Sequence, residues 1–145
     1  MSGNDGFDVE AFLARPLTAR LATSGPTVRP VWYLWEDSAF WIITGRWWRV
    51  HAHVKADPRI ALVVDECDLA TGIVRQVIVR GRGELVPFDL PRGRRKLRRY
   101  LGVDESRWDP RFRLADGVAD SSQTKNAWLR IGVESLVAKD LSFSV

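Results

Sequence analysis

The clearest candidates for binding chemistry lie in the segment from Arg46 to Ala56. Arg46, Arg49 and His53 are spaced three and four residues apart. On a helix that begins near Arg46, this spacing would stack the three side chains on one face, beside the positive end of the helix dipole. Guanidinium groups and free backbone amides at a helix start suit a phosphate, and Thr44 would add a hydroxyl donor. The segment predicts an anion site, and a solvated basic face is the simpler alternative.

The two histidines of the chain are two positions apart. His51 and His53 would point to nearly opposite sides of a helix, so joint metal chelation is not expected. One of them could serve as an axial haem ligand or a general acid, although ordinary packing is the simpler interpretation. No metal site is predicted.

Tryptophan is abundant, and five of the seven tryptophans fall between Trp32 and Trp48. Adjacent Trp47 and Trp48 are not expected to point the same way. Trp48 is therefore a candidate contact to a planar ligand or to a second subunit. The sequence holds no Ser-His-Asp order, no paired catalytic carboxylates and no phosphate loop, so any enzymatic chemistry would come from a cofactor.

The run from Arg92 to Arg99 is the strongest basic patch and would by itself favour nucleic acid. However, Leu90, Leu97 and Leu101 define an apolar side. The arginines and the lysine then form the outward face of an amphipathic helix. Because no zinc-finger or zipper pattern accompanies the run, nucleic-acid binding is disfavoured.

These groups must be positioned by short β-rich runs with interspersed helices. Pro30 cannot donate to a strand ladder, so its strand is expected at an edge or bulge where a ligand can approach the backbone. Gly81 and Gly83 within one long run indicate strong curvature.

Helices are expected at 8–15, 46–56 and 89–102, while 104–126 has no clear pattern. Six strands favour an antiparallel barrel, and they are expected at 19–23, 28–35, 39–44, 59–65, 74–86 and 128–140, the last as a strand pair or one bent strand.

Length and composition indicate the number of domains and the class of protein. With 145 residues, of which 46% are apolar and 28% charged, the chain is expected to form a single domain over 1–145. The net charge of +4 gives a weak preference for an anionic ligand. The lone Cys67 and the lack of a sorting signal or a long apolar run predict a cytoplasmic protein without membrane association.

The chain resembles the split β-barrel superfamily of pyridoxamine 5′-phosphate oxidase-like proteins, in particular its flavin- and deazaflavin-dependent oxidoreductase branch. The resemblance covers roughly residues 9 to 143 and depends on the order and spacing of short stretches. These stretches are Ala19-Arg-Leu-Ala-Thr, Val28-Arg-Pro-Val-Trp-Tyr-Leu-Trp, Phe40-Trp-Ile-Ile-Thr-Gly, Asp57-Pro-Arg-Ile-Ala-Leu, Val79-Arg-Gly-Arg-Gly-Glu-Leu, Arg99-Tyr-Leu-Gly and Leu129-Arg-Ile.

The resemblance implies a mainly β fold, a six-stranded antiparallel split β-barrel of the FMN-binding kind. It also implies a homodimer with FMN or the deazaflavin F420 between the subunits, and hydride transfer to a small-molecule substrate. The cofactor ring would lie against Arg29, Pro30, Val31 and Trp32. The phosphate would be held by Thr44, Gly45, Arg46, Trp48, Arg49 and Val50.

The chain departs from the family pattern at the expected phosphate site. Trp48 and Val50 stand where the family often has serine and lysine, and His53 stands where it has asparagine. Arg46 and Arg49 offer more hydrogen-bond donors than the missing pair and could compensate for it. A different planar ligand such as haem, held without turnover, is the alternative.

Overall fold

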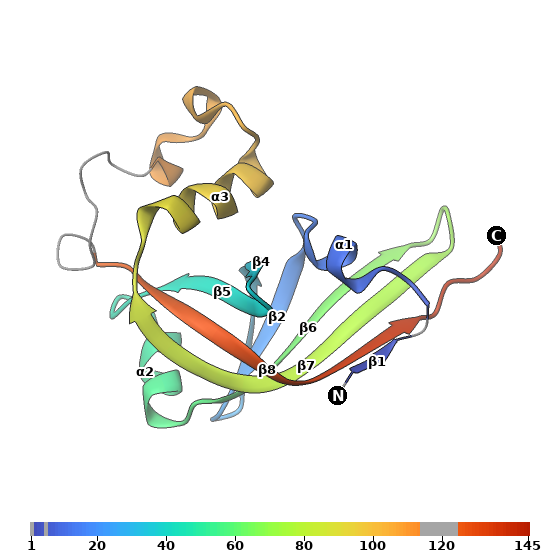
Figure 1. The fold of residues 1–145 in the computed structure, drawn as a ribbon, viewed down its shortest axis with the longest axis horizontal. Coiled ribbons are helices and arrows are strands. Elements are labelled where there is room, and N and C mark those ends of the chain that lie inside the picture. Colours follow the sequence, from blue (N-terminus) through green and yellow to red (C-terminus); the bar gives the residue numbers. More distant parts are fainter. Residues whose placement is uncertain (1, 5, 114–124) are drawn as a thin grey trace.

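A computed structural model describes residues 2–4, 6–113 and 125–145 of the chain. One mainly antiparallel sheet curls into a half-barrel, with strand order β3-β2-β6-β7-β8-β5-β4 and a short β1 paired in parallel with β8 (Figure 1). The prediction of a mainly β split-barrel fold is confirmed. The strands are β1 (Ser2–Asn4), β2 (Thr18–Thr23), β3 (Thr27–Trp32), β4 (Leu34–Glu36), β5 (Ala39–Thr44), β6 (Arg59–Asp68), β7 (Ile73–Pro87) and β8 (Ala127–Asp140).

Tyr33 explains why the sheet curls. It is the only residue between β3 and β4, yet these two strands lie at opposite ends of the strand order, so the two sheet edges must approach each other there. The Tyr33 amide donates to the Tyr100 hydroxyl (3.0 Å), which donates to the Leu17 carbonyl (2.7 Å). Because its amide is satisfied by a side chain, Tyr33 interrupts the strand expected at 28–35. The path through the sheet therefore has seven strands where six were predicted.

Bending of the long strands completes the curl. The pairing of β7 with β8 shifts register between Arg80 and Gly81. A Cβ at Gly81 would collide with the carbonyl of Gly132, so this close backbone approach requires glycine. The predicted curvature is confirmed, and 128–140 is one bent strand rather than a strand pair.

Pro30 lies on an edge strand, as predicted. Among the strands of the described chain, β3 pairs only with β2, and Pro30 stands opposite Arg20. One long side of β3 therefore has no strand neighbour, and its backbone is open to other contacts.

Three α-helices accompany the sheet in the described residues: α1 (Val9–Leu13), α2 (Arg49–Ala56) and α3 (Leu90–Leu101). Asp8 caps α1 by accepting from the Ala11 amide, and Asp89 caps α3 in the same way, as the sequence predicts. Two 3-10 turns, η1 (Glu105–Arg107) and η2 (Pro110–Phe112), occupy part of the unassigned region, and 114–124 lies outside the described residues.

The main core fills the inside of the curled sheet. Fully buried Leu62, Leu129 and Ile131 pack there with Val50 and Val54 of α2. In the part of the chain that the structure describes, no helix is both long enough and apolar enough to cross a membrane.

Candidate functional site

A groove of about 190 Å³ lies beside the edge strand β3. It forms because β4 is short: its pairing with β5 ends at Trp41, so Ile42 and Ile43 extend beyond it. Aromatic and apolar side chains dominate its walls, as expected for a site that holds a flat ring. The lining residues are Pro30, Val31, Trp32, Ile42, Ile43, Trp47, Trp48 and Lys96.

A second cavity of about 510 Å³ adjoins the groove at Trp47, which lines both. It carries two cations, Arg46 and Lys125, and no carboxylate among its lining residues. Neither cation makes an ion pair within the described chain. The lining residues are Gly45, Arg46, Trp47, His51, Lys125, Asn126 and Ala127. Groove and cavity together bring an apolar region and a cationic region side by side.

The predicted stack of Arg46, Arg49 and His53 on one helical face is wrong. Trp48 has extended backbone angles and acts as the N-cap of α2, so the helix begins at Arg49 and Arg46 lies in the preceding turn. His53 points instead toward the β2–β3 turn, where its Nδ1 lies 3.2 Å from the Ser24 carbonyl oxygen. Both arginines are exposed, and only Arg46 lines one of the two hollows.

The two histidines do separate as predicted. His51 lines the cationic cavity, and its Nδ1 is buried without a hydrogen-bond partner. Burial lowers the pKa of His51, and the nearby charges of Lys55 and Arg46 lower it further. The ring is therefore neutral at pH 7.

Trp47 and Trp48 point the same way, which corrects the prediction. Their rings stack at 5.9 Å with an interplanar angle of 14°. Strand or helix alternation does not apply to them because both lie in the turn before α2. The Arg29 guanidinium lies 5.5 Å from the Trp48 ring centroid, so Arg29 reaches the groove wall through Trp48.

Gly45 is required by the packing of this turn. A Cβ at this position would collide with the Trp47 indole and with the Lys125 carbonyl oxygen. Glycine thus lets the indole that separates groove and cavity lie against the end of β5.

Several polar side-chain atoms on β3 and β5, the strands that border the groove, are buried without hydrogen-bond partners among the described residues. They include the Thr44 hydroxyl, in a residue with no exposed surface, and the Arg29 Nε. A buried polar atom without a hydrogen bond costs free energy, so a ligand that bonded to one of these groups would offset that cost. Val50 differs, because its side chain is fully buried in the core and only its backbone could reach a ligand.

Trp32 is held by aromatic stacking on the segment between β7 and β8. Its ring lies 4.5 Å from the Tyr100 ring at 10° and 5.6 Å from the Phe112 ring at 24°. These contacts fix the groove wall to α3 and η2.

Four groove residues are not among the predicted site residues: Ile42, Ile43, Trp47 and Lys96. Lys96 is the charged one: the sequence predicts it on the outward face of its helix, but it is only 6% exposed and lines the groove. The signal lay in the spacing Gly93, Lys96, Leu97 and Tyr100, an i, i+3, i+4, i+7 pattern that marks one helix face. Burial lowers the pKa of the Lys96 ammonium to about 8.

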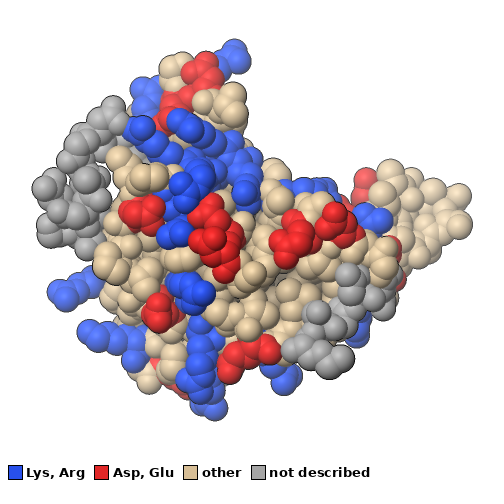
Figure 2. All heavy atoms as spheres, viewed as in Figure 1, with Lys and Arg blue, Asp and Glu red and all other residues tan. Residues whose placement is uncertain are grey.

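Most other basic residues of α3 form ion pairs with carboxylates. Glu36 accepts from both Arg92 (3.0 Å) and Arg95 (2.7 Å), and these bonds lower its pKa, with Arg95 contributing most. Arg98 pairs with Glu105 at 2.7 Å. Figure 2 shows the basic atoms over α3 bordered by acidic ones. This surface offers less free positive charge than the sequence run alone indicates.

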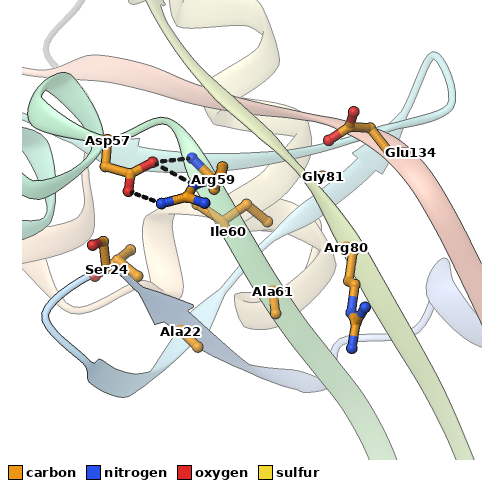
Figure 3. A pocket seen from close by; sticks show the side chains of 10 residues that line it. Ala22, Ser24, Asp57, Arg59, Ile60, Ala61, Arg80, Gly81 and Glu134 are labelled. Carbon is orange, nitrogen blue, oxygen red and sulfur yellow. Dashed lines mark hydrogen bonds and ion pairs between the residues drawn. The ribbon is translucent and has the colours of Figure 1, made fainter.

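A third hollow, of about 450 Å³, lies on the outer face of the sheet (Figure 3). The small side chains of Ala22 and Ala61, which are neighbours in the β2–β6 pairing, leave room for it. Asp57 and Arg59 are joined on one side by hydrogen bonds that lower the Asp57 pKa. None of the described residues that line this hollow is aromatic, so the groove beside β3 is better suited to a planar ligand.

Comparisons with known proteins agree with this architecture. The sequence profile of a family described as pyridoxamine 5′-phosphate oxidase matches residues 8–123. Among solved structures, an F420 reductase is similar at 21% identity and a TM-score of 0.63, covering 90% of this chain and 97% of its own. A FAD-binding protein from Mesorhizobium loti is similar at 23% identity and a TM-score of 0.61, covering 92% of each chain.

The flavocytochrome Anf3 from Azotobacter vinelandii is also similar, at 19% identity and a TM-score of 0.67, covering 96% of this chain and 70% of its own. The comparison with curated proteins found no match. At these identities the structural likeness shows a shared fold.

Proposed function

The chain belongs to the pyridoxamine 5′-phosphate oxidase family, and on this basis we propose that it is an oxidoreductase that binds a flavin-type cofactor in the groove beside β3. The observation that carries the proposal is the juxtaposition of an aromatic groove with a cationic cavity across Trp47. A cofactor with a flat ring and an anionic tail matches this arrangement, because the ring would occupy the groove and the tail would occupy the cationic cavity. FMN and F420 both fit this description.

The residues present fit such a group. The unpaired edge of β3 at Pro30 and Val31 offers backbone to the ring, and Trp48 offers an apolar surface. Arg46 and Lys125 would pair with the phosphate, and Arg49, in the first turn of α2, is a further candidate cation. The Thr44 hydroxyl, buried without a partner, is a further candidate donor.

When bound, the cofactor supplies hydride transfer to a small organic substrate. The chain itself contributes orientation and exclusion of water. Trp32, fixed by Tyr100 and Phe112, holds one wall in place. A rigid wall keeps reacting groups at a productive distance and angle.

A second copy of the chain would complete the site. The groove of about 190 Å³ is smaller than the roughly 300–1,000 Å³ typical of ligand pockets, so one subunit supplies only part of the wall. The outer sheet face carries an apolar row of Val63, Ile78 and Val137, which stand opposite one another on three strands. We assign this row to a homodimer contact.

Cofactor binding is tested by titrating the purified protein with FMN and with F420 and measuring the quenching of tryptophan fluorescence. Arg46→Ala and Arg49→Ala should each weaken binding by about 1.5–3 kcal/mol, because each removes a charged hydrogen bond. Arg107→Ala is the control, since this exposed residue lies in η1. If wild type quenches with neither cofactor, or both variants bind as wild type does, the proposal is wrong.

Haem is the second candidate, and His51 favours it. Its unpartnered, neutral imidazole lines a cavity of about 510 Å³, whereas His53 is engaged near the Ser24 carbonyl. Addition of haem should then give a Soret band that His51→Ala removes and His53→Ala retains. A spectrum without any shift would discard haem.

A further inference from the structure

Lys96 stands out because it is the one charged side chain among the described residues that line the groove, and none of these residues carries an opposite charge. The side chain enters from the middle of α3 and is 6% exposed. Among the residues that the structure describes, no carboxylate lines the groove and Lys96 makes no ion pair or hydrogen bond. This isolation contrasts with Arg92, Arg95 and Arg98 on the same helix, which all have carboxylate partners.

The surroundings of Lys96 indicate which part of a ligand it meets. Its groove neighbours are a proline, aliphatic residues and tryptophans. The exposed cations suited to a phosphate, Arg46 and Lys125, lie in the other cavity beyond Trp47. Lys96 therefore belongs to the region that faces a ring, and its charge acts there at low dielectric.

We propose that Lys96 makes this groove select a planar ligand whose ring itself carries negative charge. This inference rests on the proposed function and names the ring chemistry of that site. A deazaflavin with an ionised ring hydroxyl and a reduced flavin anion both have such a ring, whereas oxidised FMN has a neutral one. A neutral ring would close the groove over an unpaired ammonium, which is unfavourable, while an anionic ring would pair with it.

The burial of Lys96 supports the same role. An ammonium held in an apolar groove is destabilising in the ligand-free protein, as its lowered pKa of about 8 reflects. A side chain that stabilised only the fold would not be expected to carry this penalty. Replacing it should thus improve the stability of the free protein and impair the binding of anionic rings.

The test is anaerobic titration of wild type, Lys96→Met and Lys96→Gln with F420, reduced FMN and oxidised FMN, followed by tryptophan fluorescence. Wild type should bind F420 and reduced FMN at least about tenfold more tightly than oxidised FMN. Both variants should lose this preference, with oxidised FMN changed less than about threefold, and Lys96→Met should melt at a higher temperature. Lys55→Met, on an exposed residue of α2, is the control and should retain the preference.

Two different results would contradict the role of Lys96. An equal loss for all three ligands in the Lys96 variants would show that Lys96 contacts the phosphate. Unchanged affinities would show that it contacts no ligand, and either result overturns the inference. If wild type binds none of the three, the proposed function itself fails and the inference falls with it.

Discussion

At the scale of single residues, the most informative groups are those that the fold buries without a partner. Thr44 at the end of β5 and Lys96 in α3 are both buried polar side chains, and Lys96 lines the groove beside β3. Burial of a polar group without a hydrogen bond costs about 1–3 kcal/mol. Replacing such a group with an apolar one is therefore expected to maintain or raise the stability of the free protein and to weaken ligand binding.

Thr44→Val removes a hydroxyl that makes no hydrogen bond in the free protein. The free energy of unfolding should stay constant or rise by about 1 kcal/mol, while the affinity for FMN or F420 should fall. The matched control is Thr23→Val, because the Thr23 hydroxyl bonds to Thr27 and should cost about 1 kcal/mol when removed. Urea unfolding checks both; a clear destabilisation by Thr44→Val would contradict the assignment.

Lys96 should make stability depend on alkaline pH. Between about pH 8, its folded pKa, and the ordinary lysine value of 10.5, the unfolded chain holds a proton that the folded chain has lost. The contribution of Lys96 to the free energy of unfolding therefore becomes more favourable as the pH rises across that window. Lys96→Met should be more stable than wild type by about 1–3 kcal/mol at pH 7, and the difference should shrink toward pH 10.5.

Denaturant unfolding of both proteins at pH 7, 9 and 10 measures this difference directly. Lys55→Met serves as the exposed control and should track wild type. A constant difference between Lys96→Met and wild type at every pH would show that the ammonium is not the cause.

At the scale of elements, α3 is the part that joins the groove to the two sheet edges. Its Tyr100 hydroxyl bonds to the backbone of Tyr33, where β3 gives way to β4, and to Leu17 before β2. Its ring also stacks on Trp32. One side chain thus fixes the closing point of the sheet and one groove wall.

Tyr100→Phe should destabilise the protein by about 1–3 kcal/mol, because it leaves the buried Tyr33 amide unpaired while the ring stacking remains. Tyr33→Phe is the matched control: the Tyr33 hydroxyl has no hydrogen bond, so its loss should be neutral or slightly stabilising. Thermal unfolding of both variants measures the contrast. Equal effects would show that the hydroxyl of Tyr100 does not hold the sheet edges.

At the scale of the whole molecule, the small volume of the groove, about 190 Å³, favours a second copy of the chain as a partner. Figure 1 shows one curled sheet with α2 and α3 near the same end, where the groove lies. The apolar row on the outer face is the contact proposed for a second copy.

Ile78→Arg should disrupt this contact, since it places a charge at the centre of the Val63, Ile78 and Val137 row. Light scattering after size exclusion should give a dimer for wild type and a monomer for the variant, with weaker cofactor binding. Val103→Arg is the control, because Val103 is 85% exposed and follows α3. A monomeric wild type, or a variant that stays dimeric, would refute this interface.

The sequence by itself determined the elements whose signals are local. Asp8, Asp89 and Gly102 mark helix ends through their own caps, Pro30 marks an edge strand through its missing amide, and Gly81 marks the bend. These features depend on neighbouring backbone, so spacing and residue type suffice to predict them.

Only the tertiary structure decided what surrounds the groove. The burial of Lys96 depends on contacts between segments distant in sequence, whereas the start of α2 at Arg49 and the stacking of Trp47 on Trp48 arise in an irregular turn. Side-chain direction in an irregular turn follows no period, and a lysine among arginines carries no mark of burial unless the facing strands are known.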